Sequence, residues 1–179
     1  MSTVLKEAKE RCGVITVNRP EVLNAVNQKT MEELKDAFMD FRRDSGVGVI
    51  ILTGAGEKSF IAGADITEMS SASATEAVEL ITGGEMISTQ EAEEMGLVNH
   101  VVPPEDLMPK AMEIANSILS RGPEAVRLSL EAIQHGMEMT LAERLDYEAN
   151  LLGIVFSTED KDEGTTAFME KRKPKFQGK

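Results

Sequence analysis

The segment Val47–Thr53, Val-Gly-Val-Ile-Ile-Leu-Thr, is apolar throughout and constrains the fold more than any other stretch of the chain. A strand with apolar residues at successive positions is typical of a parallel sheet whose two faces are both covered. Upstream, the β-branched run Val14–Val17 ends at Asn18-Arg19-Pro20 and predicts another strand. Between them, Thr30 and Glu33 have capping-box spacing, and apolar residues recur at helical steps. Strand, helix and buried strand in succession predict an α/β fold.

The chain after Thr75 is predicted to be mostly helical, with one short strand at Leu97–Val102. Capping residues and glycines mark the expected helices: Ser88 with Glu91 up to Gly96, Asp106 up to Gly122, Pro123 onward, Thr140 with Glu143 onward, and Ser157 or Thr158 up to about Lys173. We therefore expect an N-terminal α/β part, residues 1–79, and a mostly helical C-terminal part, residues 80–179.

Composition narrows the function classes. The net charge of −12 disfavours nucleic-acid binding, because an acidic chain repels phosphate backbones. The single Cys12 cannot form an internal disulfide, which fits a reducing compartment. No apolar run approaches the roughly 20 residues of a membrane span, and the first residues are too polar for a signal peptide. These features predict a soluble cytoplasmic protein that binds neither nucleic acid nor membrane.

Two glycine-containing segments follow the apolar run. The first, Gly54–Ser59, fits neither the dinucleotide-binding pattern, which needs a third glycine at Ser59, nor the P-loop, which needs glycine directly before lysine. The second, Ala62-Gly63-Ala64-Asp65, consists of small residues. It is either an ordinary turn or a place where a ligand approaches the backbone.

Four stretches, in this order, carry a resemblance: VNRPEVLNAV, VGVIILTGAGEKSFIAGADITEM, LITGGEMISTQEAEEMGLVNHVVP and STEDKDEGTTAFMEKRKPKF. Together they resemble the crotonase family (the enoyl-CoA hydratase/isomerase superfamily), in particular its bacterial enoyl-CoA hydratases. The resemblance implies a spiral of β-β-α turns followed by a helical region that builds trimers, often paired into hexamers. It also implies binding of acyl-CoA thioesters and hydration of trans-2-enoyl-CoA to 3-hydroxyacyl-CoA in fatty-acid β-oxidation. Coenzyme A would enter as part of the substrate, with no separate cofactor and no metal.

The resemblance also implies site residues. The Ala62 N–H would be one of two backbone donors that stabilise the thioester enolate, a role for which a fixed dipole in a dry site is suited. Small side chains at Gly63 and Ala64 would admit the thioester, and Asp65 would cap the next helix. Residues that would contact coenzyme A are Val22, Leu23 and Ala25, and, toward a neighbouring subunit, Phe168 and Lys171. Ordinary packing and a solvated basic helix end are the competing interpretations of these two groups.

The chain departs from the family after Glu79, which runs directly into LITGGEMIS. By the resemblance, roughly the middle third of the expected chain is missing here, with the second oxyanion donor and both catalytic glutamates. Nothing in the sequence replaces them: Glu85 matches a different family segment, Glu91, Glu93 and Glu94 are expected on an exposed helix face, and His100 and His135 have no partners at metal or triad spacing.

Three interpretations follow. The first is an enoyl-CoA hydratase-type protein without its central segment. The second is a shortened, catalytically inactive acyl-CoA-binding or assembly subunit. The third, least favoured by the failed glycine patterns, is an unrelated α/β nucleotide-binding module.

Overall fold

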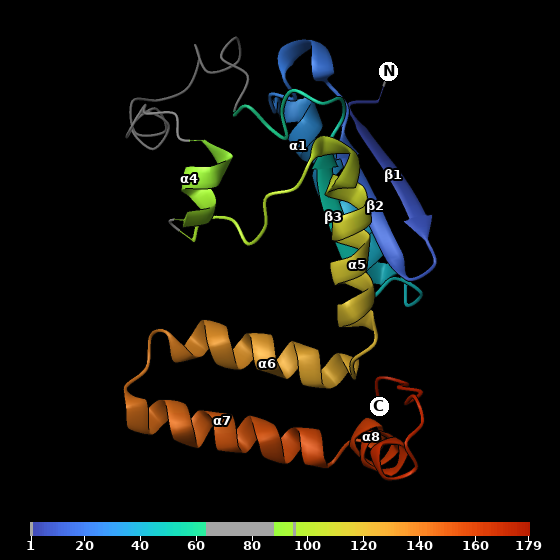
Figure 1. Ribbon diagram of the computed structural model, residues 1–179, viewed down its shortest axis with the longest axis vertical. Coiled ribbons are helices and arrows are strands. Elements are labelled where there is room, and N and C mark those ends of the chain that lie inside the picture. The colour runs from blue at the N-terminus through green and yellow to red at the C-terminus, as the bar shows by residue number, and fades with distance from the viewer. Residues whose placement is uncertain (1, 64–87, 95) are drawn as a thin grey trace. The chain divides into compact units, whose positions relative to one another are not determined.

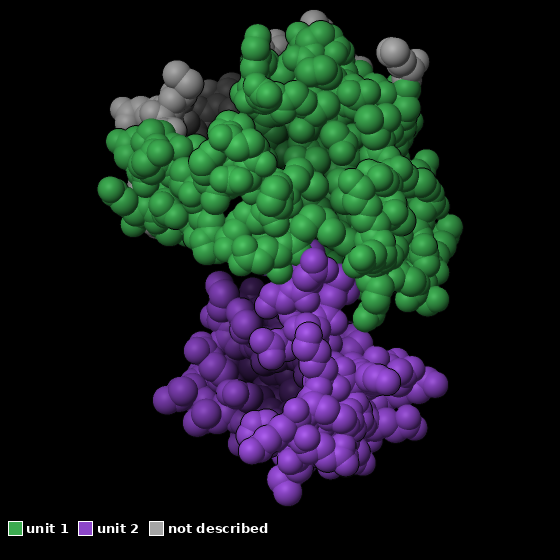
Figure 2. Space-filling model, turned by 45° about the vertical axis from the view of Figure 1, so that its right-hand side comes forward, with its two compact units in different colours: residues 1–113 green, residues 114–179 purple. Residues whose placement is uncertain are grey.

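The computed structural model describes residues 2–63, 88–94 and 96–179 (Figure 1). The chain forms two compact units, residues 1–113 and 114–179, which Figure 2 distinguishes by colour. The predicted division between residues 79 and 80 falls outside the described ranges and stays a prediction. Among the helices of the described ranges, none combines the length and apolar character needed to span a bilayer.

Unit 1 contains a sheet with the order β1–β2–β3 among its described residues. Strand β1 (Val4–Lys9) pairs antiparallel with β2 (Cys12–Val17), and β2 pairs parallel with β3 (Val49–Gly54). The two predicted strands and their parallel pairing are therefore confirmed. Strand β1 was not predicted, because five of its six residues are exposed and its sequence carries little apolar signal.

Helix α1 (Gln28–Arg43) connects β2 to β3 and packs on the sheet (Figure 1). Its Ala37 and Phe41 join Val4 and Ile15 in a buried cluster. Burying an aliphatic or aromatic side chain of this size contributes roughly 1.5–3 kcal/mol, so the β-β-α-β segment has a core of its own. Cys12 is also buried, and this burial raises the pKa of its thiol despite a backbone hydrogen bond from Ile51.

The start of α1 differs from the prediction. The N-cap is Asn27, whose Oδ1 accepts the Thr30 N–H at 2.9 Å. Thr30 is therefore inside the helix, and the predicted capping box with Glu33 is wrong. Asparagine is as good an N-cap as any residue, so the helix begins three residues earlier and its first satisfied donor is the Thr30 N–H rather than the Glu33 N–H.

Glu33 instead holds the N-terminus of the chain. Its Oε2 accepts hydrogen bonds of 2.7–3.0 Å from Ser2 Oγ, Thr3 N, Thr3 Oγ1 and Val4 N. Burial alone would raise the pKa of Glu33, but these hydrogen bonds together outweigh it and lower the pKa to about 2. The carboxylate thus ties the start of β1 to α1.

Strand β3 has no fully buried residue: all six of its positions are half-buried. The prediction that both faces are covered is not met by the residues that the structure describes. The predicted strand at Leu97–Val102 is also wrong, since these residues form bends and irregular backbone. Its apolar residues are partly exposed, and a strand without a pairing partner is not stable.

The helices that follow agree better with expectation. Helix α4 (Thr89–Glu94) has the predicted Ser88–Glu91 capping box, and Gly96 ends it with a φ of 74°. A 3₁₀ turn (Pro104–Asp106) leads into α5 (Leu107–Leu119), which crosses the boundary between the units.

Unit 2 consists of the end of α5, then α6 (Pro123–Gly136), α7 (Leu141–Phe156) and α8 (Glu159–Met169). The predicted start residues are confirmed: α6 has proline in its first turn, Thr140 and Glu143 form a capping box for α7, and Thr158 caps α8.

Helix α8 ends earlier than predicted, and the chain after it folds back. Asp160, near the start of α8, accepts the N–H groups of Gln177 and Gly178 at 2.6 and 2.8 Å. The side chain of Arg172 pairs with Glu163 at 2.7 Å. The basic C-terminal segment is thereby fastened to the acidic first half of α8.

Candidate functional site

Two loops follow the carboxyl ends of the parallel strands β2 and β3. We call residues 18–26, which lead from β2 to the N-cap of α1, the first loop, and residues 55–63, which follow β3, the second loop. Because the parallel register pairs Val17 with Gly54, the two loops start side by side. Crevices at the carboxyl ends of parallel strands are the usual ligand sites of open α/β sheets.

The side chain of Asn24 joins the two loops. It is only 1% exposed, and its Oδ1 accepts the Arg19 N–H at 3.0 Å within the first loop. Its Nδ2 donates to the carbonyl oxygens of Ala55 at 2.9 Å and Ser59 at 2.8 Å in the second loop. Asn24 was not predicted as a site residue, although Leu23 and Ala25 on either side of it were. The only signal was an asparagine in a tight turn, where asparagine is common for local reasons.

The backbone adds two further links between the loops. The Val26 N–H donates to the Gly63 carbonyl at 2.8 Å, and the Ala62 N–H donates to the Leu23 carbonyl at 3.1 Å. The two motifs that the resemblance assigned to one site, VLNAV and FIAG, are therefore neighbours in the structure. They lie about forty residues apart in the sequence.

One predicted role is corrected by this pairing. The Ala62 N–H is not free for a thioester oxygen, because the Leu23 carbonyl already accepts its hydrogen. An oxyanion donor must point at the position of the developing charge, and this one points at the first loop instead. Ala62 therefore acts in this structure as a link between the loops.

Glycine is required where the second loop begins. A Cβ atom on Gly54 would lie 2.2 Å from the Phe60 carbonyl oxygen and 2.7 Å from Asn24 Nδ2. No side chain larger than hydrogen fits between the end of β3 and the folded second loop.

A cavity of about 230 Å³ lies between the loops, lined by Pro20, Leu23, Asn24 and residues 55–59. A larger hollow of about 530 Å³ runs along β3, shares Gly56–Ser59 with it, and is lined chiefly by apolar residues, including Ile51, Leu52 and Phe60. The larger volume falls in the range usual for small-molecule sites. Lys58 is an exposed cation that lines both spaces.

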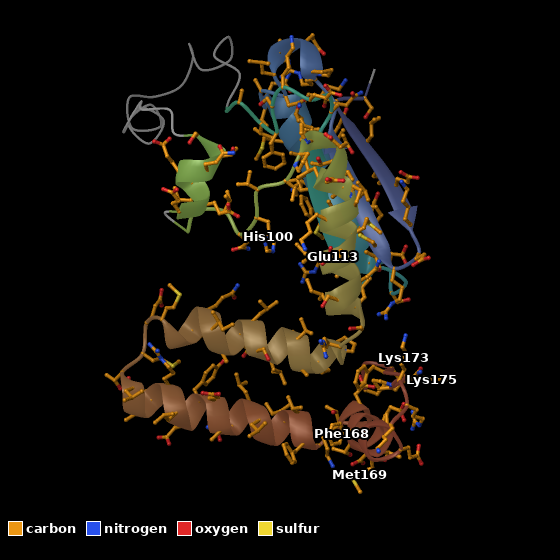
Figure 3. The ribbon with its side chains drawn as sticks, in the orientation of Figure 1. His100, Glu113, Phe168, Met169, Lys173 and Lys175 are labelled. Carbon is orange, nitrogen blue, oxygen red and sulfur yellow. The ribbon has the colours of Figure 1, made fainter. Side chains whose placement is uncertain are left out.

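The other predicted contact residues have separate positions. Val22 and Leu23 are 39% and 46% exposed on the first loop, and Ala25 is half-buried beside them. Ala64 and Asp65 lie outside the described residues. In unit 2, Phe168 is 84% exposed near the end of α8, where Figure 3 labels it. Lys171 is exposed and has a φ of 55°.

The residues to which the sequence assigned no catalytic role have the following positions where they are described. Glu91, Glu93 and Glu94 are exposed on α4, and His100 is exposed. The His135 ring meets the Tyr147 ring edge-on, with centroids 5.9 Å apart. Glu85 lies outside the described residues. Within the described ranges, no group of three or more His, Cys, Asp or Glu side chains is arranged to hold a metal ion.

The chain is similar in sequence and fold to known proteins of one family. The family model for enoyl-CoA hydratase/isomerase matches residues 7–79 and 70–179. The chain belongs to the enoyl-CoA hydratase/isomerase family. It is 32% identical, over an alignment of 252 positions, to the crotonyl-CoA hydratase of Syntrophomonas wolfei and to the short-chain-enoyl-CoA hydratase of Clostridium acetobutylicum, with 97% of each chain covered. The enoyl-CoA hydratase of Bacillus anthracis has the same fold, with 28% identity, a TM-score of 0.90, and coverage of 99% of this chain and 100% of that one.

These findings confirm the family resemblance and the crotonase-like α/β fold. The chain is an enoyl-CoA hydratase-type protein, and a nucleotide-binding module of another class is ruled out. The comparisons do not favour the inactive-subunit interpretation. They agree with a shortened chain, since the alignment extends over 252 positions and the chain has 179 residues. The family model also matches as two segments, whose overlap at residues 70–79 ends at the predicted junction after Glu79.

Proposed function

We propose that this chain binds short-chain acyl-CoA thioesters where the first and second loops meet, and that it hydrates trans-2-enoyl-CoA. In that reaction the hydroxyl of water adds to C3 of the acyl chain and a proton adds to C2. The observation that carries the proposal is the pairing of the two loops, which brings together Leu23, Ala62 and Gly63 from separate motifs. The names of the relatives, a crotonyl-CoA hydratase and a short-chain-enoyl-CoA hydratase, support the substrate class.

The small-residue segment supplies the approach to the backbone. Gly63 has a φ of 124°, and a Cβ atom placed there would meet nothing within 4 Å. Space on this side of the second loop lets a ligand reach the main chain. We propose that Gly63, Ala64 and Asp65 contact the thioester, with Val22, Leu23 and Ala25 along the path of coenzyme A.

A titration and a turnover assay test this proposal separately. Calorimetry with crotonyl-CoA should show saturable binding, and NAD serves as the control ligand that should not bind. Turnover is followed as the loss of the enoyl-thioester absorbance of crotonyl-CoA. Absence of crotonyl-CoA binding would overturn the proposal. Binding without turnover would support the acyl-CoA site and refute the hydratase reaction, for which a carboxylate must activate water.

We also propose that the chain assembles as a homotrimer or a dimer of trimers, in which Phe168 and Lys171 reach the coenzyme A of a neighbouring subunit. Large apolar side chains in unit 2 support this. They are more than half exposed at Leu130, Ile133, Met137, Leu141, Leu145, Leu152, Phe156, Phe168 and Met169. Exposed apolar surface of this extent is typical of interaction sites. Light scattering on the purified protein should give three or six times the chain mass of 19.5 kDa, and a monomer would contradict the assembly.

The remaining proposals concern cofactors and location. Hydration transfers no electrons, so we propose that the protein uses no cofactor beyond the coenzyme A of its substrate. The single, buried cysteine supports a cytoplasmic location, because free thiols persist in reducing compartments.

A further inference from the structure

We infer that Asn24 is the positioning residue of this site: its side-chain amide fixes the first loop against the second, and thereby sets where the backbone meets the acyl-CoA ligand. The expected effect on acyl-CoA binding rests on the proposed function. The joining of the two loops rests on the hydrogen bonds of Asn24 alone.

The geometry of Asn24 is unusually demanding for a loop residue. Its backbone is left-handed, with a φ of 58°, directly after Leu23 with a φ of 53°. Among residues with a side chain, asparagine adopts this conformation with comparatively little strain. The turn then directs the side chain inward, where it is 1% exposed.

The chemistry of the amide explains why no similar side chain suffices. One end of the group accepts a hydrogen from Arg19 N, and the other donates two hydrogens to Ala55 O and Ser59 O. An aspartate has the same size but no donor, so its second oxygen would face two carbonyl oxygens at less than 3 Å. An asparagine is therefore required to satisfy both loops at once.

The position of Asn24 explains the effect on the ligand site. Leu23, immediately before it, offers its carbonyl to Ala62, and Val26, two residues after it, donates to Gly63. Once the amide holds the second loop by Ala55 and Ser59, the residues that follow are brought to the first loop. Without it, the end of the second loop would lose the support that aligns it with Leu23 and Val26.

Two substitutions test the role. Asn24→Asp keeps the shape and the acceptor for Arg19 while removing both donors. Asn24→Gly removes the whole side chain and tolerates the left-handed backbone, so it remains informative if the buried charge of the aspartate variant prevents folding. The matched controls are Asn27→Asp, which retains the acceptor that caps α1, and Asn27→Ala, which removes that cap and destabilises the fold while leaving the hydrogen bonds of the Asn24 side chain in place.

The first readout is amide hydrogen exchange, measured by NMR on the full chain. In the Asn24 variants, the amides of Val26 and Ala62 should exchange about tenfold faster or more, relative to the Ile15 amide in β2. In both Asn27 variants this ratio should be unchanged. Equal protection of Val26 and Ala62 in Asn24→Gly and the wild type would overturn the inference.

The second readout is crotonyl-CoA affinity by calorimetry, at a temperature where every variant is folded. The dissociation constant should rise about tenfold or more in the Asn24 variants, since small misplacements of positioning groups have large effects, and should stay the same in the controls. If the exchange ratio changes and wild-type affinity is retained in the Asn24 variants, the positioning role is refuted. If the wild type itself does not bind, the proposed function fails, and a changed exchange ratio still supports Asn24 as the residue that joins the loops.

Discussion

Replacing Gly54 with alanine should displace the second loop from the first, because the new side chain lies at the end of β3 where the second loop packs. Gly54 is the last residue of β3, and the new Cβ would lie 2.2 Å from the Phe60 carbonyl oxygen and 2.7 Å from both Ser59 O and Asn24 Nδ2. Contact between carbon and its neighbours is comfortable only above roughly 3.5 Å, so the Phe60 carbonyl has to move by about 1 Å. Moving this backbone also strains the hydrogen bond from Asn24 to Ser59.

The expected cost combines three effects. Overpacking a filled region costs about 1–3 kcal/mol. A buried donor or acceptor left without its partner costs about 1–3 kcal/mol more. The lower entropy of the unfolded chain with alanine returns about 0.4–1 kcal/mol. We therefore expect Gly54→Ala to lower the free energy of unfolding of unit 1 by about 3 kcal/mol.

The assay is hydrogen exchange of the most protected β2 amides, which reports the unfolding of unit 1 separately from unit 2. The matched control is Gly153→Ala in the last turn of α7, where an added Cβ meets nothing within 4 Å. Alanine is the better helix former there, so this variant should stabilise unit 2 by about 1 kcal/mol. If Gly54→Ala left β2 exchange unchanged, the packing argument for this end of the sheet would be refuted.

Three further outcomes are expected. The pKa of Glu33 is lowered to about 2 from an ordinary 4.5, so the stabilisation it contributes is complete above pH 4.5 and is lost as the pH falls toward 2. The difference in thermal midpoint between the wild type and Glu33→Gln should therefore shrink over that interval. A constant difference would contradict this. Gly13→Ala places a Cβ 2.8 Å from the Phe41 ring and should lower the free energy of unfolding of unit 1 by about 1–3 kcal/mol. Most of that cost should disappear in a Phe41→Leu background, and equal costs in both backgrounds would exclude the clash. Thr140→Ala removes the α7 capping box and should cost about 1 kcal/mol in urea unfolding followed by the fluorescence of Tyr147 in α7; no change would mean that the cap is not formed in solution.

What the sequence predicted was encoded locally. Strands β2 and β3, the apolar face of α1, and the caps of α4, α7 and α8 all depend on residues within one or two turns of each other. The errors involve partners far along the chain. Glu33 resembles a local capping residue but binds residues about 30 positions away at the N-terminus, and β1 exists because it pairs with β2.

The candidate site shows the same division. The resemblance named the two motifs that meet, but the residue that joins them could not be identified, since the carbonyl partners of Asn24 lie 31 and 35 positions further on. The free role given to the Ala62 N–H was wrong for the same reason: a backbone donor in a turn has no visible partner until the other loop is in place.

The candidate site lies on one side of the predicted junction, which separates acyl-CoA binding from hydration as properties to be tested. In the described part of the chain, the hydrogen bonds that join the loops involve residues between Arg19 and Gly63, all upstream of the predicted junction at Glu79. The core beneath them, from Val4 to Phe41, is upstream as well. The hydrogen bonds that join the two loops are therefore present in this chain, whereas β3, the strand that precedes the second loop, is only half-buried. The proposed binding at these loops should therefore persist in the shortened chain. Hydration additionally needs a carboxylate to activate water, and the resemblance places that carboxylate in the segment missing after Glu79.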